Sequence, residues 1–310
     1  MPQPPLRSRH GLHVYLYRQL KGTIAISVTM ILLLLCNCLQ ILSALFLPFS
    51  RPLVRTLNRF IGGFWWGVCD VLAERWGINV EIAGDTLPLK ENVMVIANHQ
   101  AMTDINTLFR LARRQERIGD LKWFVKDIIK YVPGVGWGMI FLDCIFLKRD
   151  WKRDKDRLYR QLSRFQEEQI PIWTLSFVEG TRIRPHKHAA SIEYAQSKGL
   201  KALDHLLLPR TKGFCLTLDA LRGHLDAVYD TTIAYIGGVP SLWQWCRGDV
   251  SRVGLHVRRF EISSLPQNEE ELAAWVQARW REKDRLLGHF YTHGEWPSDL
   301  TILNKESAEV

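Results

Sequence analysis

The residues best suited to chemistry are a histidine and an aspartate five positions apart, His99 and Asp104. They follow an apolar run, Val93–Ala97, which is typical of a buried strand and ends at Asn98. A histidine can act as a general base near neutral pH, because its ordinary pKa is about 6.5. A carboxylate on one ring nitrogen would fix the tautomer and stabilise the imidazolium that forms. The same spacing also fits a polar loop in which Asp104 caps the next helix.

A second group of chemically useful residues closes another predicted strand, in the run Phe177-Val-Glu-Gly-Thr-Arg182. Arg182 has the planar guanidinium that binds a phosphate through two parallel hydrogen bonds. Glu179 could hold that arginine or bond a substrate hydroxyl, and Gly180 and Thr181 lie between the two. Taken alone, the run also fits a β-turn with a surface ion pair.

Other cations and histidines stand in less specific settings. Arg149 ends the run Phe146-Leu-Lys-Arg149, and Lys126 precedes a turn-rich segment at 133–138, so both also fit a solvated edge. His186 and His188 are spaced like metal ligands, but no acidic or third ligand is near them in the sequence, and we expect an exposed loop there. The sequence has no G-x-S-x-G elbow, no G-x-x-x-x-G-K-[ST] loop and no H-E-x-x-H helix.

Composition narrows the choice of partners. The 310-residue chain has a formal net charge of +9, which favours an anionic partner such as nucleic acid, a phospholipid surface or a phosphorylated substrate. Nucleic acid is not expected, because no zinc-finger, RNP or helix-turn-helix pattern occurs and the basic residues are spread out. Six cysteines without a C-x-x-C pair indicate free thiols in a reducing compartment rather than a disulfide framework or a zinc site.

An uncharged segment at 23–49 is long enough to cross a bilayer, which takes about 20 apolar residues. A cleaved signal peptide is the competing interpretation, but the run is too long and no clear cleavage site follows it. We therefore predict a basic tail at 1–22 and membrane-anchoring helices at 23–76. Within these, the segment 51–76 mixes arginines with aromatic residues. It fits an interfacial helix, a second hairpin arm or a core helix of the domain.

From residue 77 onward the composition is that of an α/β domain. Apolar runs alternate with amphipathic stretches, which predicts a mixed sheet flanked by helices. The predicted strands lie at 79–82, 93–97, 122–126, 140–147, 171–177, 228–235 and 253–262, and the predicted helices at 105–115, 151–169 and 267–290. We place this domain at 77–292 and expect a mobile tail at 293–310.

Taken together and in this order, the blocks resemble those of the glycerophospholipid acyltransferases, the family of the 1-acylglycerol-3-phosphate acyltransferases. Asn98-His-Gln-Ala-Met-Thr-Asp104 is similar to the family's N-H-x-x-x-x-D motif. Phe146-Leu-Lys-Arg149 and Phe177-Val-Glu-Gly-Thr-Arg182 resemble its second and third blocks, and Asp230-Thr-Thr-Ile-Ala-Tyr235 stands where the fourth falls. The run Leu208-Pro-Arg-Thr-Lys-Gly-Phe214 resembles the branch with lysocardiolipin and lysophosphatidylinositol acyltransferases and their bacterial relatives.

The resemblance implies the glycerolipid acyltransferase fold with an N-terminal membrane helix or helical hairpin. It implies that His99, oriented by Asp104, deprotonates the free hydroxyl of a lysophospholipid, which attacks the thioester of acyl-CoA or acyl-carrier protein. The acceptor would be 1-acyl-sn-glycerol-3-phosphate and the product phosphatidic acid, with no metal or cofactor required. The residues implied to bind the acceptor and its phosphate are Lys126, Arg149, Glu179, Gly180, Thr181 and Arg182.

Two alternatives stay open. The acceptor could be a larger lysophospholipid, such as lysophosphatidylglycerol, lysophosphatidylinositol or lysocardiolipin, acylated from acyl-CoA or by a transacylase reaction of the tafazzin kind. The chain could instead be a non-catalytic lipid-binding scaffold, although the intact His99 and Asp104 argue against this. The chain ends without the further hydrophobic segments common in eukaryotic members, so we expect a bacterial inner-membrane enzyme with its catalytic domain in the cytoplasm.

Overall fold

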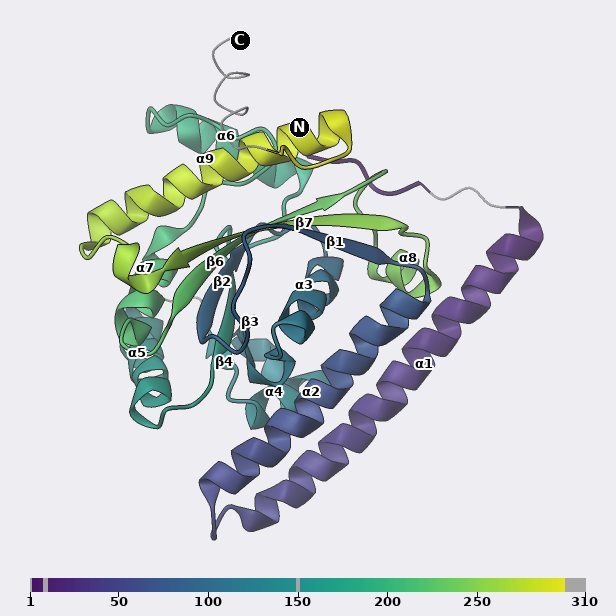
Figure 1. Ribbon diagram of the computed structural model, residues 1–310, viewed down its shortest axis with the longest axis vertical. Helices are drawn as coiled ribbons and strands as arrows, with labels where there is room; N and C mark the ends of the chain where they lie inside the picture. Colours follow the sequence, from purple (N-terminus) through teal and green to yellow (C-terminus); the bar gives the residue numbers. More distant parts are fainter. Residues whose placement is uncertain (1, 8–10, 149–150, 299–310) are drawn as a thin grey trace.

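The computed structural model describes residues 2–7, 11–148 and 151–298, except the side chains of 151–154, and shows one mixed seven-stranded sheet with helices on both faces (Figure 1). The strand order is β1-β7-β6-β2-β5-β3-β4, and every neighbouring pair is parallel except β6 and β7. This confirms the predicted fold class. The strands are β1 (Asn79–Gly84), β2 (Val93–Ala97), β3 (Leu121–Lys126), β4 (Ile145–Leu147), β5 (Trp173–Phe177), β6 (Ala227–Tyr235) and β7 (Arg252–Glu261).

The central strand β2 shows how the two cores form. All five of its residues are buried, and successive side chains point to opposite faces of the sheet. Val93, Val95 and Ala97 join one core, while Met94 and Ile96 join the other. The first core includes α2 (Arg51–Arg75), α3 (Thr103–Arg114) and α8 (Leu242–Arg247), and the second includes α5 (Trp151–Glu167), α7 (Thr211–Leu221) and α9 (Glu269–His293). A strand covered on both faces needs the continuous apolar run that the sequence shows.

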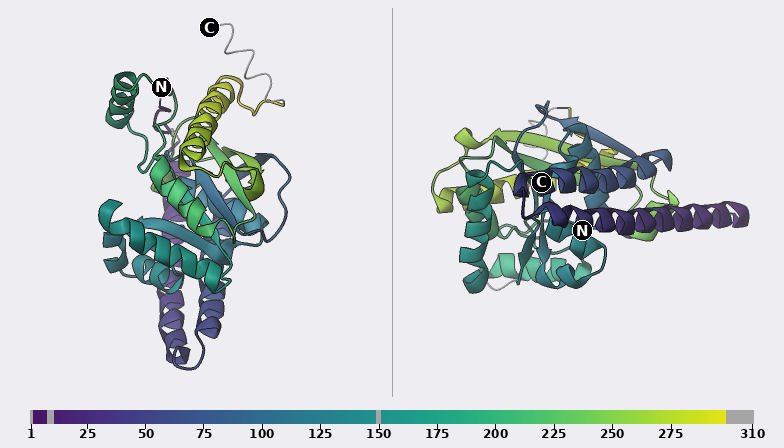
Figure 2. Two further views of the ribbon diagram at one scale, coloured as in Figure 1. Left: turned by 90° about the vertical axis from the view of Figure 1, so that its left-hand side faces the viewer. Right: turned by 90° about the horizontal axis from the view of Figure 1, so that it is seen from below.

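Helices α1 (Leu12–Ser43) and α2 form an antiparallel hairpin whose tip projects beyond the sheet (Figures 1 and 2). Among the described residues, one helical stretch, Leu12–Phe46, is long and apolar enough to cross a membrane. Helix α2 packs on the domain, because a stripe of residues about four apart is buried, including Asn58, Gly62, Trp66 and Asp70. Its opposite face leaves Phe60 and Phe64 exposed. Helix α1 begins at Leu12, so the predicted basic tail is partly helical.

The predicted long strand at 140–147 is wrong. Residues Val135–Phe141 form the short helix α4, and only Ile145–Leu147 pair with β3. The backbone conformation at two glycines explains why a helix forms here instead of a strand. Gly134 has a φ of 79°, which starts the helix, and a Cβ at Gly136 would lie 2.0 Å from the carbonyl oxygen of Ile129. That oxygen belongs to the short 3₁₀ helix η3 (Asp127–Tyr131), which packs against α4.

The loop expected at His186 and His188 is also wrong, because Pro185–Ser197 form helix α6, although His186 is exposed as expected. His188 is buried, and its Nε2 donates to the carbonyl oxygen of Leu203 at 2.8 Å. Helices α7 and α8 were not predicted either. The expected C-terminal tail starts inside α9, and Trp296 packs on Phe290 with ring centroids 4.3 Å apart. Residues 299–310 of that tail lie outside the described part of the chain.

Candidate active site

The site lies at one edge of the sheet because four neighbouring strands are parallel. Strands β2, β5, β3 and β4 point the same way, so the segments that follow them meet at their common carboxyl edge. These segments are the loop after β2, the run after Phe177 and the residues around Lys126, each of which was predicted to stand at the end of a strand. Arg149, also predicted at a strand end, lies outside the described residues.

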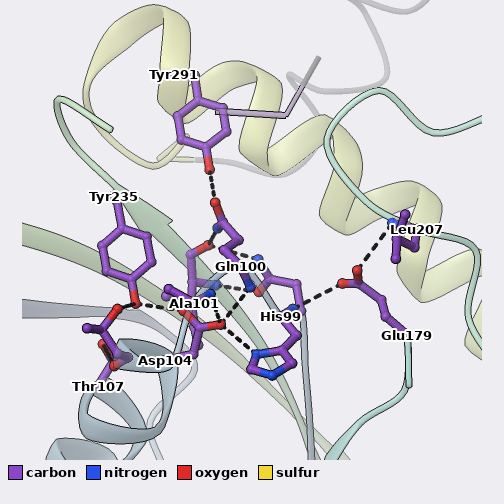
Figure 3. A network of polar contacts seen from close by, with 12 residues as sticks. His99, Gln100, Ala101, Asp104, Thr107, Glu179, Leu207, Tyr235 and Tyr291 are labelled. Atoms are coloured by element: carbon purple, nitrogen blue, oxygen red, sulfur yellow. Dashed lines mark hydrogen bonds and ion pairs between the residues drawn. The ribbon is translucent and has the colours of Figure 1, made fainter. Parts of the chain in front are cut away.

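Asp104 is the centre of the polar network (Figure 3). Its fully buried carboxylate accepts four hydrogen bonds. Oδ2 accepts from His99 Nδ1 at 2.9 Å and from the backbone N–H groups of Gln100 at 2.6 Å and Ala101 at 2.9 Å. Oδ1 accepts from the Tyr235 hydroxyl at 2.6 Å. The carboxylate therefore folds the loop around itself and holds the histidine ring at the same time.

The rest of the loop is fastened to β6. The side-chain amide of Asn98 both donates to the carbonyl oxygen of Ile233 and accepts from its N–H, at 3.0 and 2.8 Å. Gln100 donates to the same carbonyl oxygen at 2.7 Å and accepts from the hydroxyl of Tyr291 on α9 at 3.2 Å. Since both amides are buried and bonded, the loop has little freedom to reposition His99.

The His99 ring is held on one face and open on its edge. It stacks on Phe177 with ring centroids 3.9 Å apart and an interplanar angle of 13°. Because a carboxylate only accepts, Nδ1 carries the proton in the contact with Asp104, which leaves the lone pair on Nε2. Nε2 makes no hydrogen bond to the described residues, and the side chain stays 14% exposed. This is the arrangement that a general base needs.

Glu179 bonds the protein backbone rather than an arginine. Oε1 accepts from His99 N at 3.1 Å and Oε2 from Leu207 N at 3.3 Å (Figure 3). Burial raises the pKa of this carboxyl to about 8, although both backbone N–H groups oppose the shift. Glu179 therefore links the loop after β2 to the chain before α7.

The turn after Glu179 is shaped by its neighbours. Gly180 has a φ of 71°, and a Cβ there would lie 3.0 Å from Cδ of Arg210, so this arginine lies across the turn. Thr181 accepts a hydrogen bond from Lys187. Arg182 is half-buried and has no acidic partner among the described residues. Its neighbour Ile183 donates its backbone N–H to the carbonyl oxygen of His99 at 2.8 Å.

Lys126 ends β3 at this edge and is exposed, without an ion pair to any residue that the structure describes. The structure thus brings the predicted residues other than Arg149 to one edge of the sheet. Hydrogen bonds link His99 to Asp104 and to Glu179, and Lys126 and Arg182 are cations at the same edge.

Sequence reasoning did not identify the residues that support Asp104 and His99 from behind. Tyr235 donates to Asp104 from 131 residues away and also contacts the Thr103 hydroxyl at 2.9 Å. Phe177 supplies the stacking face for His99. Their position in the sequence could have identified them, because Phe177 and Tyr235 are each the last residue of a strand whose carboxyl end lies at the edge of the sheet that carries the site.

Comparisons with known proteins identify the family of the chain. The "Acyltransferase" family model matches residues 79–233, and "Acyltransferase C-terminus" matches 245–309. A probable 1-acyl-sn-glycerol-3-phosphate acyltransferase 5 of Arabidopsis thaliana is 34% identical, over 82% of this chain and 68% of that protein. The human 1-acyl-sn-glycerol-3-phosphate acyltransferase gamma is 33% identical, over 86% of this chain and 72% of that protein.

The crystal structure of the 1-acyl-sn-glycerophosphate acyltransferase PlsC from Thermotoga maritima has a similar fold. Its TM-score is 0.52 at 15% identity, over 85% of this chain and 94% of that one. At this identity the likeness supports the fold alone. The family matches and the relatives confirm the predicted resemblance: the chain belongs to the glycerophospholipid acyltransferase family and is an O-acyltransferase.

Proposed function

We propose that the protein transfers a fatty acyl group from acyl-CoA or acyl-carrier protein to the free hydroxyl of 1-acyl-sn-glycerol-3-phosphate, giving phosphatidic acid. The observation that carries the proposal is the contact of His99 Nδ1 with the buried Asp104 at the carboxyl edge, which leaves Nε2 open. The relatives named above support the choice of acceptor.

In the proposed reaction, His99 Nε2 takes the proton of the acceptor hydroxyl as its oxygen attacks the thioester carbonyl carbon. The C–S bond of the resulting tetrahedral adduct then breaks, and the imidazolium returns its proton to the leaving thiolate. Asp104 stays ionised and stabilises the imidazolium between these steps. No covalent intermediate forms on the enzyme.

In this proposal two cations at the same edge of the sheet bind the acceptor, the exposed Lys126 and the half-buried Arg182. Arg182 and Lys126 lack acidic partners among the residues described, so their charge is free to bind the acceptor's phosphate. Gly180 and Thr181 shape the turn that presents Arg182, and Arg149 would add a third cation. Glu179 acts in this proposal by holding the backbone of His99, since both of its oxygens are already bonded.

We place the enzyme at a membrane, anchored by the α1–α2 hairpin, with the catalytic domain on the cytoplasmic side of a bacterial inner membrane. The long apolar α1 supports the anchor, and both acceptor and product are membrane lipids. The chain's net charge of +9 suits an anionic headgroup layer, where each nearby Lys or Arg adds about 1 kcal/mol.

The test is acyl transfer by the detergent-purified protein from palmitoyl-CoA to a panel of lysolipids, with His99→Ala beside the wild type. We expect transfer to 1-acyl-sn-glycerol-3-phosphate, and its loss in His99→Ala at an unchanged thermal midpoint. Preferred transfer to lysophosphatidylglycerol, lysophosphatidylinositol or lysocardiolipin would move the enzyme to phospholipid remodelling. Near-normal turnover in His99→Ala would refute the role given to the histidine.

A further inference from the structure

A short segment beside the site exposes an unusual number of large apolar side chains. Within η3, α4 and the turn between them, residues 127–141, five such side chains are each between 42% and 67% exposed: Ile128, Tyr131, Val132, Trp137 and Ile140. We call these five side chains the η3–α4 surface. Exposed apolar patches of this kind mark contact with a protein or a membrane. The established activity gives them no role.

The η3–α4 surface is held in place by close packing against the hairpin. A Cβ at Gly134 would lie 3.0 Å from Leu33 of α1, and a Cβ at Gly62 of α2 would lie 2.7 Å from Leu142. Glycines therefore let the segment that contains α4 pack closely on both helices. Trp137 and Ile140 remain on the outer side of this contact. The outward position is thus fixed by packing rather than left to a loose loop.

The hairpin that packs on α4 also exposes large apolar side chains. The second half of α1 and the short 3₁₀ helix η1 (Ala44–Phe46) after it expose five leucines, and α2 adds two aromatic side chains. These residues are Leu34, Leu35, Leu39, Leu42, Leu45, Phe60 and Phe64. The apolar area is therefore shared between the candidate membrane helix and the catalytic domain, which is what one lipid layer covering both would require.

The chemistry of the segment favours a lipid layer over a protein partner. Tyr131 and Trp137 lie in the segment that follows the exposed Lys126, and such aromatic and basic residues gather at membrane–water interfaces. Lys130, whose Nζ lies 5.0 Å from the centroid of the Tyr131 ring, is paired with Asp127. Helix α4 has seven residues, far fewer than the roughly 20 needed to span a bilayer. The segment can therefore enter only the nearer leaflet and cannot cross the bilayer. Its backbone groups would stay hydrogen-bonded within η3 and α4.

We propose that the η3–α4 surface inserts into the boundary between headgroups and acyl chains of an anionic bilayer, as a membrane contact that the catalytic domain makes in addition to that of the hairpin. The segment starts directly after Lys126, the last residue of β3, so insertion sets this lysine at headgroup depth. The acceptor's phosphate then reaches the site while its acyl chain stays in the leaflet. This last step rests on the proposed function; the insertion itself does not.

The first test is fluorescence quenching by brominated lipids, with the full chain reconstituted in vesicles of phosphatidylglycerol and phosphatidylethanolamine. Trp137→Phe keeps an apolar ring but removes one fluorophore, so we expect the quenchable part of the emission to fall. Trp275→Phe on α9 is the matched control and should leave that part unchanged, because α9 covers the second core rather than the hairpin. Equal quenching of the wild type and Trp137→Phe would overturn the proposal.

The second test compares acceptors in wild type, an Ile128→Ser/Tyr131→Ser variant and a Tyr194→Ser control. Tyr194 on α6 is 56% exposed and lies outside the surface. For a vesicle-bound acceptor we expect the double variant to raise KM by at least about tenfold, because two apolar side chains no longer enter the lipid. A short-chain acceptor dissolved as monomers should be used equally well by all three proteins.

Each outcome is decisive. An equal loss of activity with both acceptors would show that the surface belongs to the catalytic site. A change of oligomeric state in the double variant, together with no lipid quenching of the wild type, would show that the surface is a protein interface. Either result overturns the membrane contact. Absence of transfer in the wild type would instead refute the proposed function, and the quenching result would still decide the insertion.

Discussion

Replacing Asp104 by asparagine would separate the charge of this side chain from its geometry. Oδ2 accepts from two backbone N–H groups and from His99, so the carbonyl oxygen of an asparagine must occupy that position. The new NH₂ group then faces the Tyr235 hydroxyl, which can accept from it while donating to Thr103. The loop, and the tautomer with the proton on Nδ1, are therefore retained, and only the negative charge is lost.

The magnitude follows from the distance between the two groups. The contact is 2.9 Å between His99 Nδ1 and Asp104 Oδ2, which places the charge centres about 4 Å apart. At an effective dielectric constant of about 20, the carboxylate stabilises an imidazolium there by about 4 kcal/mol. The ring is 14% exposed, and water weakens the interaction. We therefore expect Asp104→Asn to lower kcat by roughly 10²–10³, at about 1.4 kcal/mol per tenfold change.

The assay is steady-state acyl transfer by wild type, Asp104→Asn, Asp104→Ala and His99→Ala, each with its thermal midpoint. Asp104→Asn should stay folded and retain more activity than His99→Ala. Asp104→Ala should also lose stability, because the buried N–H groups of Gln100 and Ala101 lose their acceptor at about 1–3 kcal/mol each. If Asp104→Asn kept more than about a third of wild-type kcat at normal stability, the electrostatic role of the carboxylate would be refuted.

Three further predictions concern residues around the dyad and beneath α9. Tyr235→Phe removes the hydroxyl that donates to Asp104, and kcat measured at saturating acceptor should fall about tenfold, with KM nearly unchanged, since a hydrogen bond to a charged group contributes about 1.5–3 kcal/mol. Burial raises the pKa of Glu179 from 4.5 to about 8, so the native state holds this proton more tightly than the unfolded chain. Stability should therefore fall as pH rises from 4.5 to 8, and thermal unfolding across that range should show a smaller slope in Glu179→Gln. Lys283→Ala removes the ammonium group that lies 2.5 Å from Oδ1 of the buried Asp230, so thermal unfolding should show a loss of about 3–5 kcal/mol in stability. The double variant Lys283→Ala/Asp230→Ala should recover part of this loss, because no unpaired charge stays buried.

The features that were predictable from the sequence are those set by neighbouring residues. The apolar run of β2 and its abrupt polar end fixed the strand at Val93–Ala97 and placed His99 at its carboxyl end. The contact with Asp104 follows from the same short segment, because the first turn of α3 brings position 104 back to the ring. Parallel neighbours then bring the Phe177 run to the same edge.

The features that escaped prediction depend on distant contacts. The apolar run at 140–147 was assigned to one strand because its helix, α4, is set by backbone contact between Gly136 and Ile129 rather than by a helical pattern. The backbone contacts of Glu179 escaped prediction for a similar reason: an acidic residue three positions from Arg182 suggests a local partner or a substrate hydroxyl, whereas the structure bonds it to the backbone N–H of His99, 80 residues away. Periodicity is silent on such contacts.

The link between the hairpin and the site is an ion-pair network that no local pattern shows. Buried Asp70 of α2 accepts from Arg110 at 2.7 Å and from Arg113 at 2.5 Å, both on α3, the helix whose first turn carries Asp104. Apolar packing between two helices tolerates small rotations, whereas a buried carboxylate bonded to two guanidiniums does not. The pairs therefore fix the rotation of α3 relative to α2. In the membrane-bound enzyme that we propose, the depth and tilt of the hairpin thus determine how the site meets the lipid, and the η3–α4 surface, packed on the same hairpin, supplies the second point of contact that such an orientation needs.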